Sequence, residues 1–116
     1  MSAWHPVEET TLTVPWKVLA SHVGVGLLTE GWTLDVEAPP GGEVRCFPVP
    51  VVFDRPFDSV PVVQLGLTGF DLDQRDSAHV SLKATQVTPT FFQAEVWIWA
   101  GTRVYSVEFH WLAIGA

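Results

Sequence analysis

The stretch from Phe91 to Ile114 constrains the fold more than any other part of the sequence, because it holds two apolar alternations separated by a short break. Apolar residues occupy positions 92, 94, 96 and 98 in the first arm and positions 105, 107, 109 and 111 in the second. Alternation of this kind is typical of β-strands that bury one face. Both arms are therefore predicted to be strands.

A hairpin is the simplest arrangement of the two arms. A shared apolar face requires Val96 to pair with Tyr105, and requires a loop of two or four residues centred on positions 100 and 101. The outer face would carry Gln93, Glu95, Trp97, Ser106, Glu108 and His110. His110 would then lie near Glu95 and Glu108, which we interpret as a polar subunit contact rather than a metal or acid–base site.

The rest of the chain predicts four more strands. They are expected at Val23–Trp32, Val44–Phe53, Val60–Thr68 and Ala78–Val87. Pro48 and Pro50 point to the same side of the second strand, which suits the edge of a sheet where no donor is needed. Six antiparallel strands with short turns and no long helix predict an all-β fold, a six-stranded antiparallel β-sandwich.

Residues 1–22 are predicted to form an N-terminal extension to a domain of residues 23–116. Thr13 followed by Pro15 is typical of a helix start, and Trp16, Val18 and Leu19 could form the apolar side of a short helix. An extended arm is the alternative, because residues 10–14 alternate as a strand would.

The composition excludes some partners and favours others. The chain has 116 residues, of which 47% are hydrophobic and only 16% charged, so some apolar surface is expected to lie between subunits. The net charge of −7 disfavours nucleic acid and anionic membranes as partners. No apolar run is long enough for membrane insertion.

Cys46 is the only cysteine, so it cannot form an intramolecular disulfide, and it is expected to be a small buried hydrophobe. The N-terminus lacks the basic and apolar regions of a signal peptide. We therefore expect a cytoplasmic protein, or one exported by a non-classical route.

The sequence contains no motif for catalysis, metal binding or a cofactor. Asp71, Asp73 and Asp76 lack the glycine and glutamate of a calcium loop, and the four histidines lack zinc spacing. No nucleophile elbow or phosphate-binding loop is present. An enzyme is therefore the least favoured class, and no cofactor or metal is expected.

Trp99 departs from the alternation of its strand and adjoins a turn. An aromatic ring in such a position can stack on the apolar face of a sugar, while polar groups nearby bond to its hydroxyls. The alternative is a side chain that covers the end of the sandwich, and periodicity alone favours neither.

Several motifs together resemble the H-type lectin domain of snail agglutinins and of discoidins. They are the run VVFDRPFDSVPVVQLGLTGFDLD, the sequence VTPT before Phe91, the pattern W-x-x-T-x-V-Y that starts at Trp99, and the closing WLAI. The resemblance extends over roughly residues 24–114. It implies a six-stranded sandwich that binds galactose or N-acetylgalactosamine without a metal, at a site near the junction of two subunits of a trimer.

The resemblance also implies a set of site residues. Glu43, with Gly41 nearby, would accept hydrogen bonds from sugar hydroxyls, and Trp99 would form the apolar wall. The tyrosine of the family corresponds to Tyr105, which the pairing with Val96 would place on the core side as a support of the site. His79 stands where the family has an arginine, and Ala100 stands where the family often has a polar residue, so both weaken the expected set of donors.

We therefore expect a non-enzymatic lectin that binds glycans with terminal galactose or N-acetylgalactosamine. It would assemble with itself as a homotrimer or a hexamer, and would gain strength from multivalency. The alternative is a structural oligomerisation module of a larger assembly, which keeps the sandwich and has lost sugar binding.

Overall fold

The computed structural model describes residues 16–36, 44–73, 78–99 and 101–116. These residues form six strands, which are β1 (Lys17–Gly26), β2 (Arg45–Val52), β3 (Val62–Leu72), β4 (Val80–Thr85), β5 (Phe91–Ile98) and β6 (Val104–Gly115). The described part of the chain holds no helix that could cross a membrane. The expected all-β class is confirmed.

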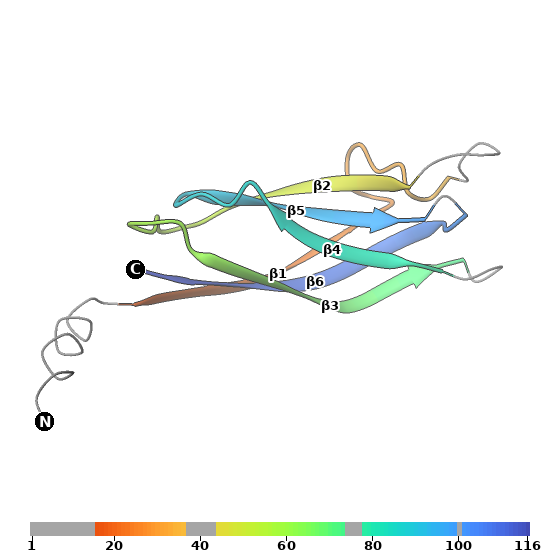
Figure 1. Cartoon of the computed structure of the whole chain (residues 1–116). Helices are drawn as coiled ribbons and strands as arrows, with labels where there is room; N and C mark the ends of the chain where they lie inside the picture. Colours follow the sequence, from red (N-terminus) through yellow and green to blue (C-terminus); the bar gives the residue numbers. More distant parts are fainter. Residues whose placement is uncertain (1–15, 37–43, 74–77, 100) are drawn as a thin grey trace, which may run out of the picture.

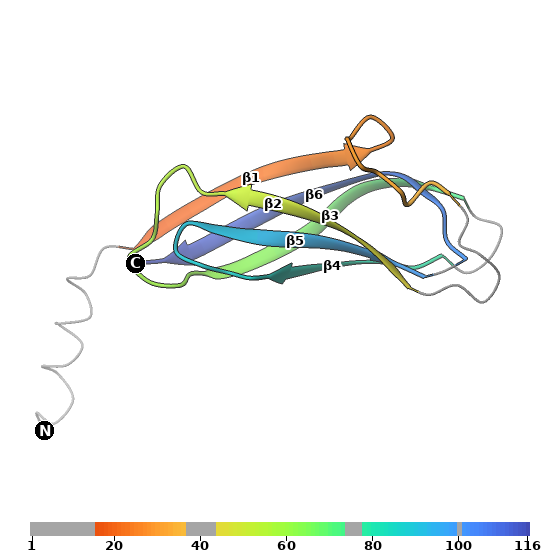
Figure 2. The same ribbon diagram turned by 90° about the horizontal axis from the view of Figure 1, so that it is seen from above.

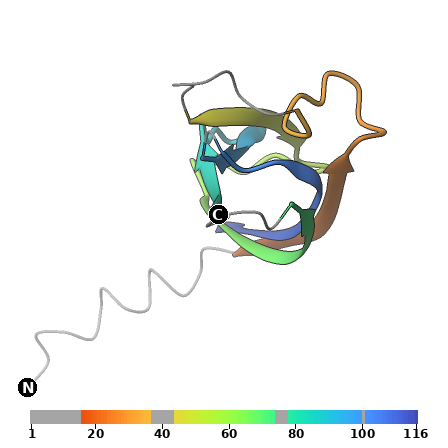
Figure 3. The same ribbon diagram turned by 90° about the vertical axis from the view of Figure 1, so that its right-hand side faces the viewer.

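The strands form two antiparallel sheets of three strands each, in the orders β1-β6-β3 and β2-β5-β4. Figure 1 shows the sheet of β2, β5 and β4 lying over the sheet of β1, β6 and β3. Figure 2 shows that all six strands run along one long axis, and the end view in Figure 3 shows the two sheets enclosing a common interior. The predicted six-stranded sandwich is therefore correct.

The core lies between β5 and β6, which are the central strands of the two sheets. The apolar residues at positions 92, 94, 96 and 98 of β5 are completely buried, as their alternation predicts. They face Val107, Phe109 and Ala113 of β6, which are also completely buried. The rings of Phe92 and Trp111 meet edge to face with centroids 5.6 Å apart, a favourable aromatic geometry across the two sheets.

The predicted hairpin between the two arms is wrong. Val96 pairs with Phe47 and Leu82 within its own sheet, and Phe109 pairs with Val23 and Leu67 in the other. The arms face each other across the core instead of lying side by side. Burying both apolar faces satisfies the same alternation in either arrangement, so the pattern could not distinguish them.

The short helix expected around Trp16–Leu19 is also wrong, because β1 begins at Lys17. This strand crosses the expected boundary between residues 22 and 23, and it ends at Gly26 rather than at Trp32. It pairs with β6 without interruption along its ten residues. Tertiary pairing thus overrides the local helix signals. Residues 1–15 lie outside the described residues, so an N-terminal extension stays a prediction for them.

The edge position predicted for the second strand is confirmed, because β2 is terminal in its sheet. The third strand is longer than expected, since β3 continues to Leu72 through part of the predicted loop. The register between β3 and β6 shifts between Leu67 and Gly69 and again between Asp71 and Leu72.

One end of the sandwich gathers three connections. The antiparallel order brings the ends of β1, β3 and β5 and the starts of β2, β4 and β6 to this end, which lies on the right in Figures 1 and 2. Residues 27–44, 73–79 and 99–103 connect the strands there. Loops on a rigid sheet scaffold are the usual position of binding residues, so this end is where a functional site is expected.

Gly26 offers a test of the contact between β1 and β6. A Cβ atom at Gly26 would lie 2.5 Å from the backbone oxygen of Tyr105, whereas a Cβ atom at Gly24 would lie 3.8 Å from the Glu108 side chain. Gly26→Ala is therefore expected to lower the free energy of unfolding by about 1–3 kcal/mol, as overpacking does. Gly24→Ala is the matched control in urea unfolding, and equal losses in both variants would contradict the close approach of Gly26 to Tyr105.

Candidate functional site

His79 and Trp99 form a stacked pair at the end where the connections gather. Val80 pairs with Ile98 in the ladder between β4 and β5, so His79 and Trp99 occupy the next opposed positions beyond it. Their ring centroids are 4.6 Å apart and their planes differ by only 2°. Trp99 is 48% exposed, so part of its ring is open to solvent at the end of the sandwich. The structure therefore brings together two of the predicted site residues.

Thr102 bonds to the backbones of both His79 and Trp99. It is 1% exposed, and its N–H donates to the Trp99 carbonyl oxygen at 3.0 Å, which closes the turn after β5. Its hydroxyl oxygen accepts a hydrogen bond from the backbone N–H of His79 at 3.3 Å. One buried residue thus fixes the backbone on both sides of the stacked rings.

Arg45, at the start of β2, fixes Thr102 in turn. Its Nη2 donates to the Thr102 carbonyl oxygen at 2.8 Å, and its Nη1 donates to the carbonyl oxygens of Thr33 and Val36. The planar guanidinium group can bond several carbonyls at once, which a lysine cannot do in a fixed geometry. Its Nε is buried and has no partner among the described residues. Arg45 therefore joins the connection after β1 to the turn that carries Trp99.

Further bonds dock residues 32–36 against the start of β6. The Trp32 indole N–H donates to the Val104 carbonyl oxygen at 3.0 Å, and the Val104 N–H donates to the Leu34 carbonyl oxygen at 2.8 Å. Arg103 Nε donates to the Asp35 carbonyl oxygen at 3.0 Å. Hydrogen bonds therefore join residues 32–36 to residues 103 and 104, next to the turn that carries Trp99.

Tyr105 does not occupy the expected position. Val104 is completely buried and Tyr105 is only half-buried, so Tyr105 does not pair with Val96 or face the core as predicted. The register shift between Asp71 and Leu72 lies beside it and changes which residue points inward. Tyr105 lines a shallow depression of about 450 Å³ on the outer side of the β1-β6-β3 sheet, together with Glu108. The His79–Trp99 pair extends the other sheet.

His110 is not near Glu95, because β5 and β6 belong to different sheets and these residues face opposite sides of the sandwich. Glu95 accepts hydrogen bonds from the Trp97 indole N–H at 3.0 Å and from the Gln93 side chain at 2.9 Å. These two bonds lower the pKa of Glu95. Lys83 lies over the Trp97 ring, 4.8 Å from its centroid.

Cys46 lies beside Trp97 in the adjacent strand and is half-buried. Burial, and then the negative charge of Glu95, raise the pKa of its thiol, so the unreactive protonated form is favoured. Within the described ranges, no three His, Cys, Asp or Glu side chains are placed to hold a metal ion.

Three predicted site residues, Gly41, Glu43 and Ala100, lie outside the described residues. Sequence reasoning missed Arg45 and Thr102 as supports of the site. Arg45 had a signal, because it occupies an inward position in the alternation of Phe47, Val49 and Val51. A charge at such a position needs buried partners. Thr102 had no distinguishing signal.

The stacked pair could contribute to recognition by contact with an apolar ligand face and by hydrogen bonding. An indole ring that is half exposed can pack against the C–H face of a sugar, while an imidazole can donate or accept a hydrogen bond. The fold is that of the all-β sandwich class, and loops at one end of such a scaffold are the usual position of a binding site.

A comparison with protein families shows to which family of β-sandwich proteins the chain belongs. The model of the H-type lectin domain matches residues 48–114, which is more than half of the chain. The chain therefore belongs to the H-type lectin domain family, a family of carbohydrate-binding domains, and the predicted resemblance is confirmed.

Two solved structures of discoidin II from Dictyostelium discoideum share the fold, with TM-scores of 0.71 and 0.72 at 22% and 21% identity. They cover 85% and 87% of this chain, which in turn covers only 36% and 37% of theirs. A curated relative from Fuscovulum blasticum, "ATP synthase subunits region ORF 7", is 34% identical over 76 residues, or 66% of each chain. That description specifies no activity.

The role of Thr102 can be tested with Thr102→Val, which keeps the shape and removes the hydroxyl acceptor for His79. We expect a loss of about 1 kcal/mol in the free energy of unfolding, the typical value of one hydrogen bond. We also expect the His79 ring protons, which Trp99 shields, to shift downfield in NMR spectra as the stack loosens. Thr88→Val, at the opposite end of the sandwich, is the control. Unchanged His79 signals in Thr102→Val would contradict this role.

Proposed function

We propose that this protein is a lectin that binds terminal galactose or N-acetylgalactosamine through a shallow site around Trp99, and that it assembles as a homotrimer. Membership of the H-type lectin family supports binding of carbohydrate, and family and fold together favour a binding protein over an enzyme. The observation that carries the proposal is the exposed Trp99 ring, held rigidly beside His79.

The stack limits how a sugar can approach. His79 covers one face of the Trp99 indole, so a sugar would pack on the remaining exposed surface of that ring. The imidazole edge would then be available for a hydroxyl group. A ring already supported by a stacked neighbour loses little freedom on binding, which favours affinity. The arginine that is typical of the family at this position would offer more donors, so we expect weak binding at each site.

The remaining contacts are carried over from the family. Glu43, with Gly41 nearby, would accept hydrogen bonds from hydroxyls, and Ala100 would adjoin the ligand. Tyr105 would contribute from the depression that it lines on the other sheet. The depression lies on the outer face of the β1-β6-β3 sheet, and the stacked pair extends the β2-β5-β4 sheet. We therefore propose that the two belong to facing subunits at a shared sugar site, as the family resemblance implies.

Exposed apolar surface supports assembly. Val18, Ile114 and Val62 lie side by side across the outer face of the β1-β6-β3 sheet, and Val18 and Val62 are 59% and 66% exposed. Apolar side chains in adjacent positions form the kind of surface that subunit contacts cover. Static light scattering of the full chain is expected to give three times the mass of one chain. A monomer at micromolar concentration would contradict the assembly.

A structural oligomerisation module is the second candidate function. His79 and Ala100 favour it, because both replace residues that would supply stronger hydrogen bonding in the family. A glycan array distinguishes the two functions. Binding to galactose-type glycans is expected, and no binding to any glycan at high protein loading would favour the structural role.

Trp99→Ala tests the proposed site directly. Loss of the aromatic wall is expected to weaken binding to a galactose-coated surface about tenfold or more, which corresponds to about 1.4 kcal/mol. Trp97→Ala is the matched control, because this tryptophan lies two positions away on the same strand and bonds to Glu95 instead. The expected result is full binding by Trp97→Ala after its folding has been checked. Full binding by Trp99→Ala would refute the site.

A further inference from the structure

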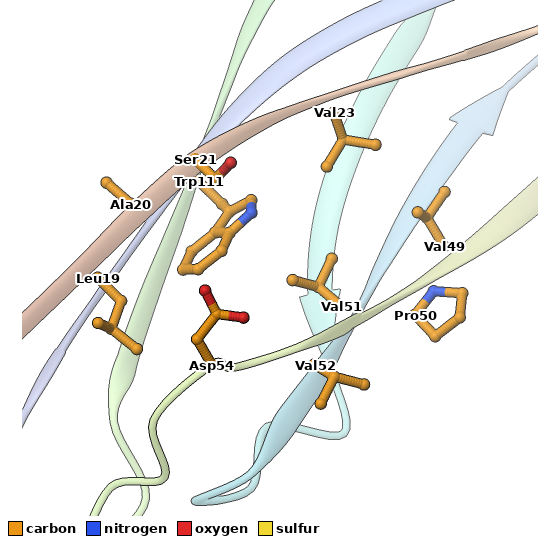
Figure 4. A pocket seen from close by; sticks show the side chains of 10 residues that line it. All are labelled: Leu19, Ala20, Ser21, Val23, Val49, Pro50, Val51, Val52, Asp54 and Trp111. Carbon is orange, nitrogen blue, oxygen red and sulfur yellow. The ribbon is translucent and has the colours of Figure 1, made fainter.

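The sandwich is open along one long side, between β1 and β2. These strands are the edges of different sheets, whereas on the opposite side β3 and β4 approach each other. A groove of about 430 Å³ lies between β1 and β2, with Leu19 and Val23 of β1 on one wall and Val49 and Val51 of β2 on the other. Figure 4 shows these side chains and the Trp111 ring directed into the groove. The groove therefore gives access to the hydrophobic core.

The unpaired edge of β1 is able to accept another strand. Leu27 donates its N–H to Tyr105 of β6, whereas the N–H and C=O of Gly26 both turn away to Thr29. In an antiparallel ladder this alternation continues, so Val18, Ala20 and His22 direct their N–H and C=O groups to the free edge. A free edge of ten residues without a proline is a template for strand addition.

The edge of β2 does not have this property. The N–H of Phe53 donates to Thr90, so the odd-numbered residues of β2 face β5. Pro48 and Pro50 therefore lie where N–H groups would point to the free edge, and proline has none. Of the two edges that border this groove, β1 is the one that can pair with an added strand.

The residues before β1 have the pattern of a strand that would fit. Residues 10–14 have the sequence TTLTV, which places Leu12 and Val14 on one side and Thr11 and Thr13 on the other. The apolar side would cover Leu19 in the groove, and the threonines would face solvent.

The segment cannot readily fold back onto its own β1. Only Pro15 and Trp16 separate Val14 from Lys17, and the favoured two-residue hairpin turns need a positive φ at the first turn position, which proline cannot adopt. A longer turn would take residues from the 10–14 segment itself and shorten the strand that could be added. The backbone groups of Lys17 also face β6, so they are not free to close such a hairpin.

We propose that residues 10–14 of one subunit add as a strand to the β1 edge of a second copy of this chain and cover the groove of that copy. Each subunit then gives one arm and receives one, so a closed ring of subunits would leave no arm and no groove unpaired. This inference is independent of sugar binding, because the groove and its edge are formed away from His79 and Trp99.

Mixed disulfide formation tests the exchange in the full-length chain. Both variants carry Cys46→Ser, which removes the native cysteine. One also carries Leu12→Cys, and the other carries Ser21→Cys, because Ser21 lines the groove. After the two are mixed, subunits are allowed to exchange and are then oxidised. We expect covalent dimers that contain both variants, in several-fold excess over a control in which Thr11→Cys replaces Leu12→Cys.

Two outcomes would overturn the proposal. One is a yield of mixed dimer no higher than in the Thr11→Cys control. The other is a chain with both Leu12→Cys and Ser21→Cys that forms only an internal disulfide, which would place the arm on its own subunit.

Hydrogen exchange gives a second measurement that does not depend on a disulfide. In the full chain, the amides of Ala20 and His22 are expected to be protected, although their own sheet leaves them unpaired. Leu12→Asp is expected to accelerate their exchange several-fold, and Thr11→Asp is expected to leave it near the original rate. Fast exchange of both amides in the unmodified chain would contradict the added strand, whatever the result of glycan binding.

Discussion

The structure depends on the burial of two apolar strand faces against each other, those of β5 and β6. Each is the central strand of a sheet, so the edge strands are aligned by pairing with them. The side chains that face inward from β5 are completely buried, and most of those from β6 are as well. Because the two central strands belong to different sheets, the turn between them must cross from one sheet to the other. That crossing leaves Trp99 at the end of the sandwich, outside the core.

The support of Trp99 follows from the same crossing. The turn carries its backbone past the start of β2, where Arg45 bonds to the Thr102 carbonyl, and past the start of β4, where His79 bonds to the Thr102 hydroxyl. Trp99 is thereby held against His79 by hydrogen bonds around the buried Thr102 as well as by the stacking of the two rings. A rigid exposed aromatic of this kind suits shallow recognition, in which affinity rests on preorganisation and on several sites acting together.

Much of the fold could be predicted from alternation, because burial of one face imposes a period of two. This identified the inward residues of β5, and Pro48 and Pro50 indicated the edge position of β2. Alternation could not assign strands to sheets, since a hairpin and a sandwich bury the same faces. It also failed at Tyr105, because a register shift between Asp71 and Leu72 changes the face at that point. The helix signals before Leu19 were overridden by pairing with β6, which no local pattern reports.

The proposed contact of Trp99 and His79 with the sugar is tested most directly by an NMR titration of the full chain with N-acetylgalactosamine. We expect the Trp99 indole N–H and the His79 ring signals to shift with sugar concentration. The Trp97 indole N–H, which is bonded to Glu95, should stay constant. Shifts at Trp97 alone, or no shift at His79 and Trp99 when the sugar reaches high millimolar concentration, would contradict a sugar site at the stacked pair.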